Sequence, residues 1–241
     1  MQRAVDGGQD DGDLALHGVA ESKAWSVNAA VINPVSPSYA GVMGVGIEVL
    51  IVDWPRVESA GPGYQEELLV DAAFGEVYSD DLFEHGWSWP TQPGEDWYGR
   101  YALRNAHGSY KPHFWAGHRW DHMRDFVEPT VRDVLDRFND ALFWGRLEDT
   151  TGVGSGLPEL PYTWDAELLL WCPPDHVPVI AGWWRQAAPQ LEVLREPFTQ
   201  HAAEPSGWIK TFESFADFLT DWGEVVTEAE RRGWGIVGLR C

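Results

Sequence analysis

Arginine, lysine and histidine side chains gather in one aromatic-rich stretch, residues 97–120, where they could bind an anion. These 24 residues contain no Asp or Glu and carry four basic side chains, in a chain whose net charge is −21. Guanidinium groups offer forked hydrogen-bond donors to an anion, and aromatic rings provide apolar pocket walls. A histidine beside such a ligand could act as general acid or base. The candidate anion-binding residues are Arg100, Arg104, His107, Lys111, His113 and Arg119.

The same stretch has a less specific interpretation. Its cations could pair with the surplus carboxylates of the chain itself, since isolated surface ion pairs contribute little to stability and need no special design. In that case the segment would hold no ligand.

A possible metal-binding pattern overlaps the end of this stretch. His118, His122 and Asp125 are spaced i, i+4 and i+7, so on a helix they fall within about 60° of one another. Two imidazoles and a carboxylate could hold a divalent metal, with His113 or His107 as a further ligand. The apolar stripe of the same helix lies on the opposite side, which favours an ordinary solvated face. We therefore predict no cofactor, with a divalent metal at these residues as the alternative.

Five carboxylates recur at helical spacing near the C-terminus, in steps of 4, 4, 3 and 4 residues. They predict an acidic ridge opposite the buried face of a helix. Like charges at this spacing destabilise a helix by about 0.2–0.5 kcal/mol per pair, so their presence suggests a basic protein partner. A plain solvated helix face is the alternative. The residues of the ridge are Glu213, Asp217, Asp221, Glu224 and Glu228.

The overall charge of the chain bears on which partners it can bind. Seventeen Lys and Arg against 38 Asp and Glu give the net charge of −21, which repels phosphate backbones and argues against duplex nucleic acid as a partner. The chain has no GxxxxGK[ST], GxSxG or HExxH motif. We expect an acidic binding protein of the immunity or inhibitor type that engages a basic protein. The alternative is an enzyme or ligand-binding protein that takes an anionic small molecule at residues 97–122.

Three helices must position these groups. Apolar residues at helical spacing predict a helix over 119–144, with Pro129 either kinking it or starting a second helix. A second helix is expected over 175–195, with a break at Pro189. The third, over 212–232, has Thr211 or Ser214 as N-cap and Gly233 as its end signal. Ser214 and Asp217 have the spacing of a capping box.

Strands are predicted from apolar, β-branched runs closed by turn residues. The clearest is the run from Met43 to Val52, followed by strands at 97–104, 163–172 and 234–240, whereas 66–78 fits a strand or a short helix. Strands mixed with helices in no regular alternation indicate the α+β class. We expect a single domain, 43–241, with a mixed or antiparallel sheet of about five strands, three main helices and a Gly/Pro-rich connection at 150–161.

We expect residues 1–42 to form a disordered tail, because residues 1–24 are rich in Gly and Asp and poor in aromatic residues. The longest apolar run, Val42–Val52, has 11 residues and contains Glu48, whereas a membrane-spanning helix needs about 20. We therefore expect no membrane association. Residues 1–20 have no apolar core of 7–15 residues such as a signal peptide needs, so we expect a cytoplasmic location. Fifteen tryptophans make the chain tryptophan-rich, and two cysteines form no disulfide framework. The oligomeric state stays open.

Overall fold

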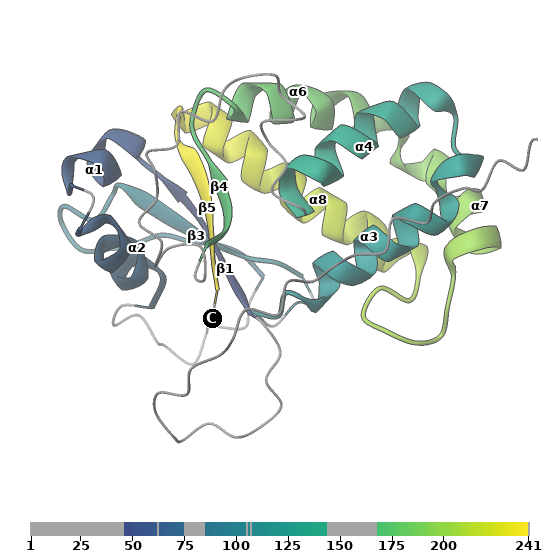
Figure 1. The fold of residues 1–241 in the computed structure, drawn as a ribbon, viewed down its shortest axis with the longest axis horizontal. Coiled ribbons are helices and arrows are strands. Elements are labelled where there is room, and N and C mark those ends of the chain that lie inside the picture. Colours follow the sequence, from purple (N-terminus) through teal and green to yellow (C-terminus); the bar gives the residue numbers. More distant parts are fainter. Residues whose placement is uncertain are drawn as a thin grey trace, which may run out of the picture. The chain divides into compact units, whose positions relative to one another are not determined.

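The computed structural model describes residues 46–61, 63–74, 85–104, 106, 108–143 and 168–240. All belong to one compact unit, Val42–Cys241. An antiparallel five-stranded sheet lies at its centre with helices on both faces, which confirms the expected α+β class (Figure 1). The predicted N-terminal tail and the connection at 150–161 lie outside the described residues.

The sheet has the strand order β2-β3-β1-β5-β4, with every neighbouring pair antiparallel. Strand β1 is central because its sequence, IEVLIV, is apolar on both faces. It pairs Val49 with Tyr101 of β3 and Leu50 with Val237 of β5. The strands are β1 Ile47–Val52, β2 Gly86–Ser88, β3 Tyr98–Ala102, β4 Leu168–Cys172 and β5 Gly235–Arg240.

Two short helices, α1 (Trp54–Ser59) and α2 (Gln65–Phe74), cover one face of the sheet. Their buried residues, including Val57 and Leu69, join Leu50 and Val237 of the sheet in a separate apolar cluster. The segment 66–78, which the sequence left undecided, therefore begins as helix α2.

The other face carries the larger core, formed by α3 (Lys111–Met123), α4 (Pro129–Phe143), α6 (Val177–Ala187) and α8 (Phe212–Arg232). The single helix predicted over 119–144 is two helices, joined by the 3-10 turn η1 (Arg124–Phe126). Pro129 begins the second, because a proline lacks the N–H that a helix interior needs but is tolerated in the first turn. The predicted buried stripe still holds, since Trp120, Met123 and Val127 are buried.

Helix α6 continues into the 3-10 segment η3 (Ala188–Leu194), where Pro189 was expected to break the helix. The short α7 (Arg195–Pro197) and the π-turn η4 (Phe198–Ala202) follow. A connection of nine residues then leads to α8, the longest described helix.

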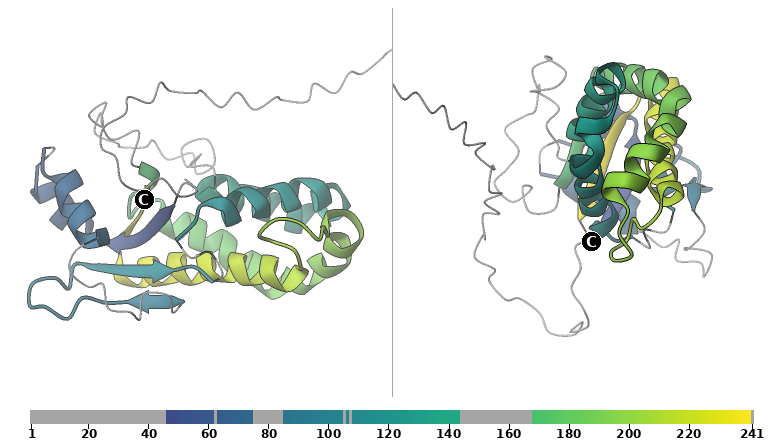
Figure 2. Two further views of the ribbon diagram at one scale, coloured as in Figure 1. Left: turned by 90° about the horizontal axis from the view of Figure 1, so that it is seen from below. Right: turned by 90° about the vertical axis from the view of Figure 1, so that its right-hand side faces the viewer.

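Helix α8 has the predicted bounds and a different capping box. Thr211 is the N-cap: its side chain accepts a hydrogen bond from the Ser214 N–H, and the Ser214 hydroxyl accepts one from the Thr211 N–H. The sequence had suggested Ser214 and Asp217 for this pair. Gly233 ends the helix at φ 68°, the left-handed conformation that glycine adopts without strain. Figure 2 shows α8 running beside β2 and β3.

No helix among the described residues is long and apolar enough to cross a membrane.

Candidate functional site

The centre of the predicted acidic ridge is buried, which corrects the expectation that all five carboxylates lie opposite the core. Asp221 is 0% exposed. Its carboxylate accepts hydrogen bonds from the backbone N–H of Arg104 and from the Tyr101 hydroxyl, and it pairs with Arg104 Nη2 at 2.8 Å. Burial raises the pKa of Asp221, and Arg104 acts against that rise. Asp221 therefore joins the end of β3 to α8.

The other ridge carboxylates also have partners within the chain. The Tyr101 hydroxyl donates to Glu224 Oε2 at 2.7 Å, and Arg104 Nη1 lies 3.1 Å from Asp217 Oδ1. At one end of the ridge, Arg195 of α7 pairs with Glu213. At the other end, Arg231 and Arg232 of α8 itself both pair with Glu228. Hydrogen bonds from Arg231, and then Arg232, lower the pKa of Glu228. The ridge is thus largely neutralised by the chain's own cations.

Two indole rings also contact the guanidinium of Arg232. It lies 3.9 Å from the ring centroid of Trp89 and 4.7 Å from that of Trp234. Cations stack favourably on the faces of such rings. Trp87 stacks on Trp89 with centroids 5.0 Å apart. These tryptophans, half-buried beside the larger core, therefore hold an arginine of the chain itself.

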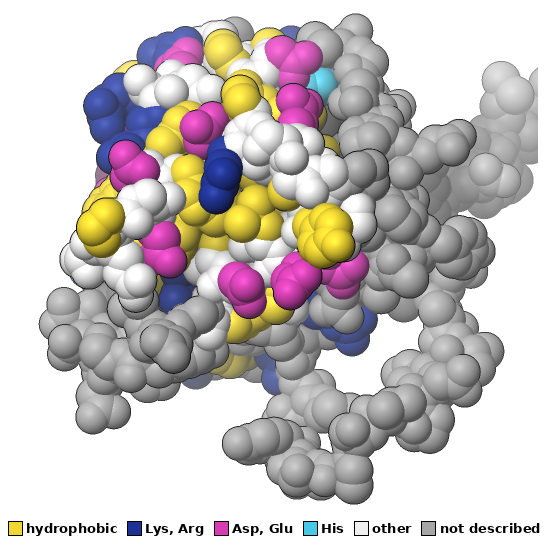
Figure 3. Space-filling model, turned by 90° about the vertical axis from the view of Figure 1, so that its left-hand side faces the viewer, with side chains coloured by type: hydrophobic (Ala, Val, Ile, Leu, Met, Phe, Trp, Pro, Cys, Tyr) yellow, Lys and Arg dark blue, Asp and Glu magenta, His cyan; other side chains and the backbone are white. Residues whose placement is uncertain are grey.

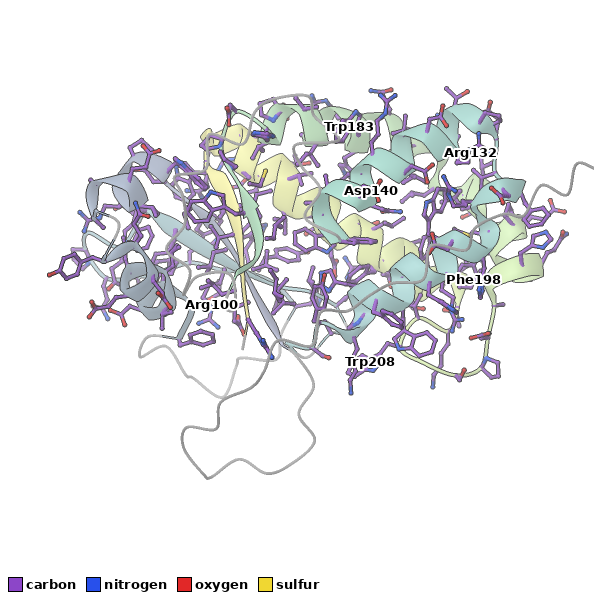
Figure 4. All side chains as sticks on the ribbon, viewed as in Figure 1. Arg100, Arg132, Asp140, Trp183, Phe198 and Trp208 are labelled. Atoms are coloured by element: carbon purple, nitrogen blue, oxygen red, sulfur yellow. The ribbon has the colours of Figure 1, made fainter. Side chains whose placement is uncertain are left out.

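The arginines of segment 97–120 do not converge on one site. Arg100 Nη2 lies 3.5 Å from Glu48 of the neighbouring strand, whereas Arg104 binds the α8 carboxylates. Arg119 is fully buried: it donates to the carbonyls of Ser206 and Ile209 and pairs with Glu204. Figure 4 shows Arg100 on the sheet, well apart from Trp208 in the loop that Arg119 holds.

The histidines and the lysine of the segment also separate. His113 is completely buried, and its Nε2 accepts a hydrogen bond of 3.1 Å from Trp222 Nε1. Burial lowers its pKa to about 3, so the ring is neutral at pH 7. Lys111 is exposed at the start of α3, and His107 lies outside the described residues. The described candidates therefore do not come together in one place.

The proposed metal residues fall on two elements. His118 and His122 lie on successive turns of α3, but the helix ends at Met123, and Asp125 is exposed in η1. The helical spacing that placed three ligands on one face therefore fails at the third residue. Among the described residues, no group of three or more His, Cys, Asp or Glu side chains is placed to hold a metal.

Negative charge without an ion-pair partner lies on α1 and α2, a region that no sequence pattern indicated. Helices α1 and α2 carry four carboxylates and one cation, Arg56, and Asp53 adds a fifth carboxylate just before α1. None of the five forms an ion pair with a described residue. We call them the α1–α2 acidic face: Asp53, Glu58, Glu66, Glu67 and Asp71.

An apolar surface lies within the same face. Tyr64, in the turn between the two helices, is 67% exposed. Figure 3 shows apolar side chains in the middle of this side of the molecule, with carboxylates around them and Lys or Arg side chains at the centre and along one edge. Counting carboxylates over residues 53–71 would have found the excess, but only the structure shows that no cation from elsewhere in the described chain covers it.

Comparison with known proteins adds no family: no protein-family model, no curated protein and no solved structure matches this chain.

Proposed function

We propose that this protein binds a basic protein partner, as an immunity or inhibitor protein does, and that the partner docks on the α1–α2 acidic face. The observation that carries the proposal is that the five carboxylates of this face have no ion pair among the described residues. The α8 ridge, by contrast, is already paired with arginines of the chain.

The make-up of the face fits this role. Protein interfaces combine an apolar centre, often with an aromatic anchor, and a polar rim. Exposed Tyr64 supplies such an anchor, and the carboxylates of the face supply polar groups complementary to lysine and arginine. A net charge of −21 also speeds the approach of a cationic protein.

Two variants with equal charge changes test the proposal. The first neutralises the α1–α2 acidic face by Glu58→Gln, Glu66→Gln, Glu67→Gln and Asp71→Asn. The control neutralises four ridge carboxylates by Glu213→Gln, Asp217→Asn, Glu224→Gln and Glu228→Gln. Asp221 is left intact because its buried carboxylate is structural, and Asp53 because it precedes the first turn of α1.

The immobilised full chain is used to capture proteins from an extract of its source cells at low ionic strength, and the dissociation constant of the purified partner is then measured. We expect a basic partner whose binding weakens about 10-fold or more in the first variant, the loss of roughly 1.4 kcal/mol that several rim charges supply. The control should bind like the wild type. Retention of no basic protein, or loss of binding only in the ridge variant, would overturn the proposal.

A further inference from the structure

Two histidines stand side by side on the outer face of α3, which the proposed partner surface does not include. His118 and His122 lie one helical turn apart, and their ring centroids are 4.2 Å apart with an interplanar angle of 59°. His122 is exposed and His118 is half-buried. This spacing brings two imidazoles close enough to contact one small ion at the same time.

The surroundings hold the His118 ring in place. Phe114 stacks on it with centroids 6.3 Å apart, and Trp115 meets it edge-on at 5.8 Å. Trp115 is fixed in turn, because Arg119 lies over its ring and a Cβ at Gly207 would lie only 2.7 Å from it. A metal-binding side chain that is already held in one orientation loses little conformational freedom when the ion binds.

One atom of this pair is unaccounted for. His118 Nδ1 is shielded from solvent and has no hydrogen-bond partner. Buried polar atoms are nearly always hydrogen-bonded, and an exception calls for an explanation such as an ion that completes the site. Because Nδ1 is shielded, the other ring nitrogen, Nε2, is the atom of His118 through which an ion at the pair would bind.

The charge around the pair favours a cation. Asp121 and Glu204 lie close enough to both imidazoles to interact with them electrostatically. The nearest guanidinium, Arg119, is buried and bound to Glu204 and two carbonyls. Arg119 also acts on His118 electrostatically, but its charge is shared with its ion-pair partner Glu204.

We propose that His118 and His122 chelate one divalent transition metal ion of borderline softness, such as Cu²⁺, Ni²⁺ or Zn²⁺, with water in the remaining coordination positions. Imidazole nitrogen suits these ions, whereas Mg²⁺ and Ca²⁺ prefer oxygen ligands. The affinity of such a site follows the order in which Cu²⁺ binds most tightly. The site lies on a different helix from the α1–α2 acidic face, so it stands or falls separately from the proposed function.

The test is a Cu²⁺ titration of the metal-free full chain, followed by calorimetry and by electron paramagnetic resonance. We expect one tight equivalent of Cu²⁺ with nitrogen hyperfine structure from two imidazoles, weaker binding of Ni²⁺ and Zn²⁺, and none of Mg²⁺. Because chelation depends on both rings, His122→Gln and His118→Gln should each weaken the tight site roughly 100-fold. His122 is exposed, so its variant should fold even if that of half-buried His118 does not.

The chain provides matched controls in two other exposed histidines, His85 and His201. His85→Gln and His201→Gln should leave the tight site unchanged. A tight site that survives His122→Gln, is lost in a control variant, or prefers Mg²⁺ to Cu²⁺ would overturn the proposal.

Discussion

Asp221 is the one fully buried carboxylate among the described residues, and its environment explains why. Three donors from the end of β3 surround it: the Arg104 N–H, the Arg104 guanidinium and the Tyr101 hydroxyl. Its neighbour Glu224 shares the Tyr101 hydroxyl but is exposed. Two carboxylates one turn apart on the same helix therefore have different roles.

Replacement of these two carboxylates separates the roles. Asp221→Asn should lower the free energy of unfolding by about 2–3 kcal/mol, because it leaves Arg104 without its buried partner. The expected loss is smaller than for a fully buried ion pair because the Arg104 guanidinium is partly solvated. Glu224→Gln should cost less than about 1 kcal/mol. Urea unfolding of both variants checks this. Equal losses would show that Asp221 is not a structural joint.

His113 makes stability depend on pH. Its pKa in the folded protein is about 3, whereas an unfolded chain shows the ordinary value of about 6.5. The folded state favours the neutral ring, so this contribution to stability is fully present above about pH 6.5 and is lost as the pH falls toward about 3. The loss amounts to about 1.4 kcal/mol per pH unit within that window.

His113→Gln should flatten this dependence, since a glutamine of similar size does not titrate. Unfolding free energies of wild type and variant, measured by urea at several pH values from 4 to 7, should converge as the pH falls. Parallel curves would mean that His113 does not titrate with a lowered pKa in the folded protein.

The sequence placed the five ridge carboxylates on one helix but not their partners. Arg104 and Asp221 are 117 positions apart, and their contact depends on where β3 ends relative to α8. Helical spacing contains no information about that distance. For the same reason the basic segment looked like one site, although its arginines pair with three different parts of the chain.

At the scale of elements, α8 and α6 pack through a glycine. A Cβ on Gly223 of α8 would lie 1.9 Å from the Trp184 ring of α6. Gly182 of α6 is also within a helix, but a Cβ there would meet only Arg185 Nη2, at 3.8 Å. The two glycines therefore form a matched pair, one needed for packing and one not.

Gly223→Ala should destabilise the protein by about 1–3 kcal/mol, because the methyl group overpacks the helix contact and outweighs its gain in helix propensity. Gly182→Ala should instead stabilise by up to about 1 kcal/mol. Thermal unfolding of both variants measures the difference. A stabilising Gly223→Ala would contradict the packing of α8 on Trp184.

Elements with strong local signals were predictable, and those set by distant contacts were not. Helix α8 combines an apolar stripe with signals at both ends, and β1 is a β-branched run closed by Pro55, so both were found. Strand β2 has three residues and exists only through its pairing with β3. Helix α1 has six residues, too few for a periodic pattern.

At the scale of the whole molecule, excess negative charge becomes informative only after the internal ion pairs are known. The sequence gives a net charge of −21 and a conspicuous ridge on α8, but folding pairs that ridge with arginines. The α1–α2 acidic face keeps five carboxylates without an ion pair among the described residues, and it lies on the opposite face of the sheet from α8.

The association rate of the purified basic partner, measured against ionic strength, tests the central claim most directly. Because charges on the α1–α2 acidic face steer the encounter, we expect the rate to fall at least about 10-fold between roughly 10 and 200 mM salt. The variant with Glu58, Glu66, Glu67 and Asp71 neutralised should associate slowly at low salt and respond weakly to added salt. Equal rates and salt dependence for wild type and this variant would contradict the account.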